Sequence, residues 1–166
     1  MTTRLVITVV VLLSSTITVL NQSKPAPTVQ GVWRIVEATT TGPTGSTNSK
    51  PQPSLYIFTA GHYSILRVGS ANARPSLPAD VNKATAAELN AVWGNPAFAA
   101  NAGTYDVSGS TLTTRALVAK NPYVMASGSF TAYSYKLDGK NLSLTNIRTN
   151  GGPVENATTL RLTRLE

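Results

Sequence analysis

Tyrosine is the residue type whose positions best suit ligand binding in this chain. Tyr105, Tyr133 and Tyr135 occur in segments that alternate polar and apolar residues, as β-strands do. Each tyrosine offers an apolar ring and one hydroxyl group that can orient a bound molecule. The alternative is that these rings fill a solid core, because a small barrel can be packed completely by its own side chains.

Residue types suited to nucleophilic catalysis or metal binding are scarce. The chain has no cysteine and one histidine, His62. Thiolate zinc sites, Fe–S clusters, cysteine nucleophiles and histidine pairs are therefore excluded. No serine lies in a G-x-S-x-G motif. We predict no catalytic residue, no metal and no cofactor, and we expect His62 to lie exposed after a turn.

The acidic residues fall mostly at predicted turns, loops and a helix start, where water solvates them. Glu37 differs, because strict alternation from Trp33 would place it inside the fold. A buried carboxylate without a partner is strongly destabilising, so Glu37 either pairs with an inward arginine or lies at an exposed strand end. We favour the exposed position.

Composition favours a single folded domain. The 166 residues are 42% hydrophobic and 13% charged, which argues against disorder. Without cysteine, the fold depends on its packed core rather than on disulfides. The formal net charge is +7, but the lysines and arginines are scattered singly. Nucleic-acid binding needs clustered cations, so we predict no nucleic-acid partner.

Residues 1–23 are predicted to be an export signal. Arg4 supplies a short positive region, residues 5–13 form an apolar run, and residues 14–20 continue it more weakly. No A-x-A cleavage site follows, so an uncleaved anchor is the alternative, although a bilayer span takes roughly 20 apolar residues. Residues 24–30 are predicted to be a linker. The expected location is secreted or periplasmic, with membrane contact only through an uncleaved segment.

From Gly31 onward, short β-favouring segments alternate with turns. Residues 60–61, 108–109 and 138–139 are two-residue turns, which predict three hairpins. The predicted strands cover residues 31–40, 54–59, 62–68, 103–107, 110–118, 129–137, 140–148 and 157–165. Because sequential neighbours pair in hairpins, we predict an all-β, eight-stranded antiparallel up-and-down barrel over residues 31–166.

One short helix is predicted between the third and fourth strands. Thr85 and Glu88 have capping-box spacing, Leu89 and Trp93 lie on one helical face, and Gly94 ends the segment. The flanking residues are rich in Pro, Ala and Asn. We expect the helix to cover one barrel opening, with Leu89 and Trp93 facing inward.

Alternation along the hairpins indicates which side chains share the inner face. The expected cross-strand pairs include Tyr105 with Leu112 and Tyr135 with Leu142. The predicted inner face comprises Tyr105, Leu112, Thr114, Tyr133, Tyr135, Leu142, Leu144, Leu160 and Leu162. In the first hairpin, alternation groups Tyr56, Phe58, Tyr63, Ile65 and Arg67. The other face of that hairpin is equally apolar, so a one-residue bulge would reverse its assignment.

Several of these segments carry a family resemblance. They are GVW at 31–33, LYIFTAGHYSI at 55–65, GTYDVSGSTLTTR at 103–115, YSYKLDGKNLSLT at 133–145 and LTRLE at 162–166. Together they resemble the bacterial lipocalin-like domain family of small barrels. The Gly31-x-Trp33 start also resembles the first-strand signature of true lipocalins. This resemblance implies that Trp33 closes one barrel end beneath Arg164.

The resemblance implies no catalytic residues. Many members of the lipocalin-like family have a histidine pair where this chain has Thr114 and Arg115, so imidazole chemistry is not expected. The predicted function is that of a secreted or periplasmic lipocalin-like protein that binds or carries a small, largely apolar molecule without catalysis. The alternatives are a barrel enzyme that isomerises or cyclises an apolar substrate, and a ligand-free structural module of the envelope.

Candidate site residues follow from the inner face. The candidate ligand-binding residues are Tyr105, Thr114, Tyr133, Tyr135, Tyr56, Tyr63 and Arg67, and the candidate structural residues are Gly31, Trp33 and Arg164. An inward Arg67 can anchor a carboxylate, but a solvated position at the strand end is the favoured expectation.

Overall fold

The fold is seen in a computed structural model that describes residues 28–94 and 97–166. The predicted export segment and residues 24–27 of the predicted linker lie outside the described residues. Within the described part of the chain, no helix has the length and apolar character needed to cross a membrane.

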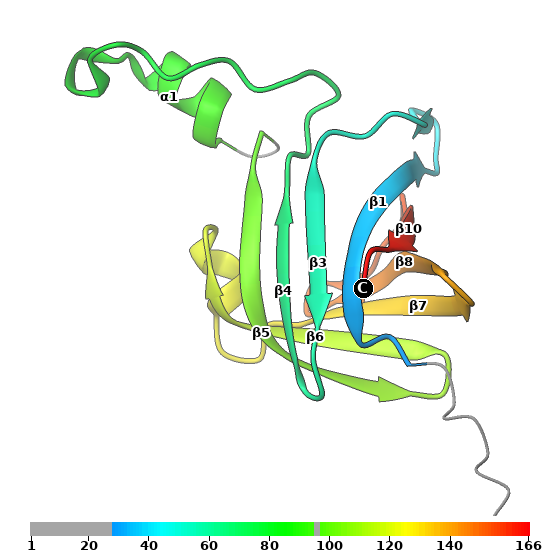
Figure 1. Cartoon of the computed structure of the whole chain (residues 1–166). Helices are drawn as coiled ribbons and strands as arrows, with labels where there is room; N and C mark the ends of the chain where they lie inside the picture. The colour runs from blue at the N-terminus through cyan, green and yellow to red at the C-terminus, as the bar shows by residue number, and fades with distance from the viewer. Residues whose placement is uncertain (1–27, 95–96) are drawn as a thin grey trace, which may run out of the picture.

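Eight antiparallel strands close into a barrel, which confirms the predicted fold (Figure 1). They are β1 (Gly31–Thr40), β3 (Ser54–Phe58), β4 (His62–Arg67), β5 (Ala99–Ser108), β6 (Thr111–Ala119), β7 (Thr131–Asp138), β8 (Asn141–Thr149) and β10 (Thr158–Arg164). Each barrel strand pairs with the next, and β10 closes the barrel by pairing with both β8 and β1. Two short strands, β2 (Ser46–Asn48) and β9 (Gly152–Pro153), pair with β1 and β8 outside this closed path.

The two ends of the barrel differ in their connections. The β3–β4, β5–β6 and β7–β8 turns are short and lie at one end, here called the closed end (Figure 1). The opposite, open end carries the long connections, which include the 3-10 helices η1 (Val81–Lys83) and η2 (Pro122–Met125). Long connections at one end leave that end free to form a binding mouth.

Two hairpin turns begin one residue later than predicted. Gly109 and Gly139 each take the first turn position with φ +56°, which suits a tight type II′ hairpin turn. Tyr105 consequently pairs with Thr114 rather than Leu112, and Tyr135 pairs with Leu144. Each register moves by two residues, so the inner face keeps its predicted members.

The hydrophobic core fills the closed half of the barrel. Its buried residues are Val29, Trp33, Tyr56, Phe58, Tyr63, Ile65, Leu112, Leu142, Leu144, Leu160 and Leu162. The inner face predicted for the first hairpin is therefore correct, and Leu66 on its other face is 41% exposed. Val29 belongs to the predicted linker, so the packed domain begins before Gly31.

Trp33 and Arg164 close the barrel end as the resemblance implied. The Trp33 side chain is fully buried, and its ring nitrogen Nε1 donates a hydrogen bond to the Val29 carbonyl at 2.8 Å. The Arg164 guanidinium lies 4.1 Å from the centre of the Trp33 ring. Arg164 also donates hydrogen bonds to the carbonyls of Thr28 and Gln30, which tie the incoming chain to the last strand.

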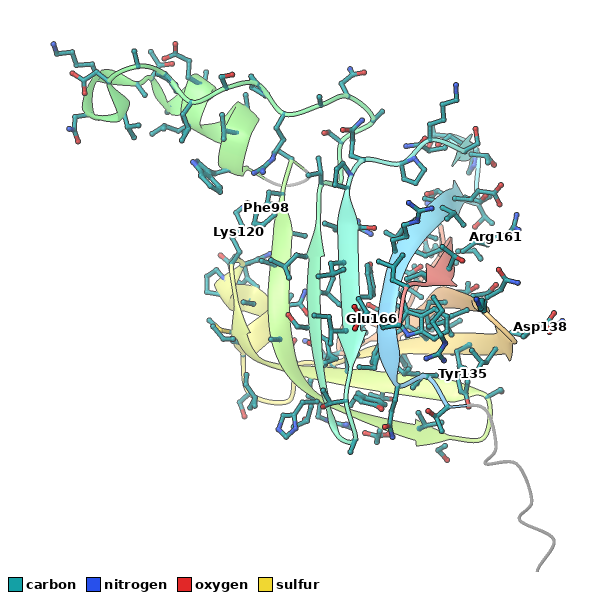
Figure 2. All side chains as sticks on the ribbon, viewed as in Figure 1. Phe98, Lys120, Tyr135, Asp138, Arg161 and Glu166 are labelled. Carbon is teal, nitrogen blue, oxygen red and sulfur yellow. The ribbon has the colours of Figure 1, made fainter. Side chains whose placement is uncertain are left out.

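Glu37 lies outside the barrel because β1 contains a bulge. The register shifts between Ile35 and Glu37, so that Glu37 stands opposite Arg161. The Arg161 side chain projects from the outer surface (Figure 2), and its Nη1 lies 3.2 Å from Glu37 Oε1. Glu37 is therefore partly exposed and paired with an outward arginine within β1, rather than with an inward arginine or at the exposed strand end that was favoured.

The predicted lid over the barrel opening is wrong. Helix α1 (Ala86–Trp93) lies in the connection between β4 and β5, the third and fourth barrel strands, and has the predicted capping box between Thr85 and Glu88. It stands to the side of the open end rather than across it (Figure 1). Val92 is its one buried residue, whereas Trp93 is 45% exposed. The apolar face of α1 is small, so the helix has little surface with which to pack over the open end of the barrel.

Candidate functional site

A cavity of about 310 Å³ occupies the open half of the barrel. Side chains from β3, β4, β5, β7, β8 and β10 line it: Tyr56, Ile65, Arg67, Ala99, Asn101, Thr131, Tyr133, Asn146, Thr149, Thr158 and Leu160. Its volume is near the lower limit of small-molecule pockets, which is about 300 Å³. The barrel therefore has a packed closed half and a hollow open half.

A second hollow of about 240 Å³ adjoins this cavity. The two share Arg67, Thr158 and Leu160. The second hollow reaches from these residues to the inner side of β1 and to the connections that precede β3 and follow β4. The shared lining makes a route from the barrel interior to the open end.

Arg67 lies at the junction of the two hollows. It ends β4, pairs across the sheet with Ser54 and Ala99, and shares the inner face with the buried Tyr63 and Ile65. Its side chain is partly buried and lines both hollows. The favoured expectation of a solvated Arg67 is therefore wrong, and its inward position follows from the alternation that the sequence already indicated.

Tyr56 and Tyr133 form the inner wall of the cavity beside Arg67. Burial raises the pKa of the Tyr56 phenol above its ordinary value, and the positive charge of the nearby Arg67 opposes that rise. Burial raises the pKa of Tyr133 as well, and the neighbouring Tyr56 adds to this rise. Both phenols therefore stay protonated at neutral pH, where they can donate and accept hydrogen bonds.

The other four candidate ligand-binding residues do not line this cavity. Tyr63 is 4% exposed and belongs to the hydrophobic core, and Thr114 is a buried polar residue that is 6% exposed. The Tyr105 hydroxyl donates to the Thr59 carbonyl at 2.7 Å near the closed end. Tyr135 packs against the core. In Figure 2 it lies on the opposite side of the barrel from Phe98 and Lys120, which are at the open end. Inner-face alternation identifies these residues correctly but gives no depth along the barrel axis.

Several polar lining residues were not singled out as candidates from the sequence. Asn146 lies two residues from Leu144 and Thr158 lies two residues from Leu160, so alternation within the predicted strands places both on the inner face. Asn101 lies before the predicted strand 103–107, because the sequence did not show that β5 begins at Ala99. Thr149 could not be found in this way. The register of β7 and β8 shifts between Ala132 and Tyr133, which brings Thr149 to the inside opposite Thr131.

The cavity lining combines polar donors with a smaller apolar surface. Arg67, two phenols, two amides and three hydroxyls provide hydrogen-bonding groups, and Ile65, Ala99 and Leu160 provide apolar contact. Among the described residues that line the cavity, none is acidic and none is a histidine. Over residues 28–94 and 97–166 as well, no cluster of three or more His, Cys, Asp or Glu side chains forms a metal site. The lining is suited to holding a polar molecule with an apolar part.

Folding stability is expected to fall as the pH rises above 10. Burial raises the pKa values of Tyr56, Tyr63 and Tyr133 above the ordinary 10.0, so the folded state holds these protons more tightly than the unfolded state. This stabilisation is complete below pH 10 and is lost as the pH rises through the folded-state pKa values. Urea unfolding at a series of pH values between 8 and about 12 measures it.

Tyr133→Phe tests this pH dependence, because it removes one buried phenol while keeping the ring. The variant should lose less stability than the wild type over the same alkaline range. Tyr123→Phe is the matched control, since Tyr123 is 82% exposed and its variant should follow the wild-type curve. Parallel curves for Tyr133→Phe and the wild type would show that the Tyr133 phenol does not contribute.

Comparison of the chain with protein-family models, with curated proteins and with solved structures finds no match in any of the three. The resemblance to the bacterial lipocalin-like domain family stays a prediction based on the segments quoted above. The function is therefore argued from the barrel and its cavity.

Proposed function

We propose that this protein binds a small molecule in the open half of its barrel and holds or carries it without chemical conversion. The observation that supports the proposal is the cavity of about 310 Å³ among inner-face side chains of six strands. A ligand-free structural module would not need such a hollow, because a small barrel can be packed completely by its own side chains.

The chemistry of the lining favours binding over catalysis. Tyr56 and Tyr133 are protonated at neutral pH and so serve as hydrogen-bond partners rather than as bases. Apolar contact comes from Ile65 and Leu160, and also from the tyrosine rings. We infer a ligand with an apolar body and at least one polar group.

The proposal includes export from the cytoplasm. Its support is Arg4 followed by the apolar run at residues 5–13. A carrier outside the cytoplasm would meet small amphipathic molecules in the envelope or in the medium. N-terminal sequencing of the protein recovered from its natural compartment tests this part of the proposal, and an intact Met1 on cytoplasmic protein would contradict it.

The binding proposal can be tested with the neutral dye N-phenyl-1-naphthylamine, whose fluorescence rises in apolar sites. Titration of the full chain should show saturable binding of one dye per molecule. Thr131→Trp, which places a large ring in the cavity, should weaken this binding by about tenfold or more, which corresponds to a loss of at least about 1.4 kcal/mol. Asn146→Trp fills the cavity from β8 and should act in the same way.

Ser134→Trp is the matched control for these cavity-filling variants. Ser134 is exposed on the outer face of β7, the strand that also carries Thr131. The Ser134→Trp variant should bind the dye as the wild type does. Dye binding that is unchanged in both cavity-filling variants would place the dye elsewhere and overturn the proposed site.

A further inference from the structure

Arg67 is a charged group in the cavity that lacks an ionic partner. The ion pairs of the described chain join Lys83 to Asp80, Arg115 to Asp106, and Arg161 to Glu37. Arg67 is in none of them, although its side chain is partly buried and lines both hollows. A partly desolvated cation without a counter-charge favours binding of an anion.

The surrounding side chains strengthen this preference. No carboxylate among the described residues lines either hollow, so no acidic neighbour competes for Arg67. Tyr56 lies against the guanidinium, and the Tyr133 phenol is close enough to respond to its charge. Asn101 and Asn146 add amide groups on the facing walls. An anion at Arg67 would therefore meet neutral hydrogen-bond donors on its other sides.

The position of Arg67 also gives a ligand its orientation. The guanidinium belongs to the last residue of β4, at the open end, whereas Ile65 lies two residues deeper and Leu160 faces the same space. A ligand whose charged end meets Arg67 would extend its apolar part toward Ile65 and Leu160. One guanidinium matches one carboxylate, because its parallel N–H groups can bond both oxygens.

We propose that the ligand class of this cavity is the small monocarboxylic acid, with its carboxylate on Arg67 and its aliphatic body toward Ile65 and Leu160. This inference rests on the proposed binding function and specifies the charge of the ligand. A phosphate ester or another dianion fits less well, since Arg67 is the one cation in the described lining of either hollow.

The test compares octanoate with octan-1-ol, which share an aliphatic chain and differ in charge. Each is titrated against the full chain loaded with N-phenyl-1-naphthylamine, and displacement of the dye gives the affinity. Octanoate should bind about 10-fold to 100-fold more tightly than octan-1-ol, because a hydrogen bond between two charged groups is stronger than one between neutral groups. This wild-type comparison needs no variant to fold.

Arg67→Gln should abolish the preference for octanoate, so that octanoate and octan-1-ol bind this variant with affinities within about twofold of each other. Arg148→Gln is the matched control, because Arg148 is an exposed arginine on β8 outside the cavity. Arg148→Gln removes the same charge and should keep the preference for octanoate.

The outcomes separate this inference from the proposed function. If octan-1-ol displaces the dye and octanoate binds no more tightly, the cavity binds small molecules but the carboxylate inference is overturned. If the preference persists in Arg67→Gln, Arg67 is not the anchor and the inference is again overturned. If neither compound displaces the dye, and the affinity for the dye is unchanged in the cavity-filling variants, the proposed function is also overturned.

Discussion

Replacing Trp33 with alanine is expected to lower the free energy of unfolding by about 3–5 kcal/mol, the range for large aromatic residues removed from a core. The Trp33 ring is fully buried at the closed end, so the substitution leaves a cavity that its neighbours cannot easily fill. The variant also loses the hydrogen bond to Val29 and the contact with Arg164. A cation over a tryptophan ring contributes about 0.5–2 kcal/mol.

Trp93→Ala is the matched control for this prediction. Trp93 is 45% exposed on α1, where it contacts Arg74 and Phe98 outside the barrel. Its loss should cost less than about 1 kcal/mol, as for most exposed substitutions. Urea unfolding measures both variants. Equal losses in the two variants would show that Trp33 does not close the barrel end.

Gly31→Ala is expected to lower the free energy of unfolding by about 1–3 kcal/mol, the cost of holding a residue with a side chain in a sparsely populated backbone region. Gly31 has φ +136°, a conformation that L-residues with a side chain rarely adopt. An added methyl group would also collide with the Arg164 guanidinium and the Glu166 carbonyl. The collision would move Arg164 away from the Trp33 ring.

Gly61→Ala provides the comparison for Gly31→Ala. Gly61 lies in the β3–β4 turn, and a methyl group there meets nothing within 4 Å. That substitution should change stability little or raise it by about 0.4–1 kcal/mol, because alanine restricts the unfolded chain. If Gly31→Ala proves as stable as Gly61→Ala, the start of β1 tolerates a side chain and the close packing against Arg164 is not required.

The secondary structure of the barrel was predictable because its signals are local. Short β-favouring segments bounded by turn residues marked all eight barrel strands, and glycines at tight turns marked the hairpins. The inner face survived a one-residue error in the turns at Gly109 and Gly139, since the register moved by two residues. The capping box of Thr85 and Glu88 likewise formed as predicted.

The candidate site was predicted only in part. Tyr56, Tyr133 and Arg67 line the cavity, whereas Tyr105 and Tyr135 face inward at other levels of the barrel. Alternation has a period of two residues and states which face a side chain occupies, but depth along the axis depends on strand tilt and stagger. These properties arise when the last strand closes on the first, which no short segment specifies.

The bulges and the position of α1 could not be predicted from local sequence patterns either. An extra residue in β1 moved Glu37 outward, and another in β8 brought Thr149 inward, because a bulge reverses alternation beyond its position. Helix α1 formed where its caps predicted, but at its place beside the open end it contacts residues distant in the sequence, such as Arg74, whose guanidinium lies over the Trp93 and Phe98 rings. Strands, turns and helix caps follow from contacts between near neighbours in the chain. The cavity and its depth follow from packing among distant strands, whose geometry is set only when the whole barrel closes.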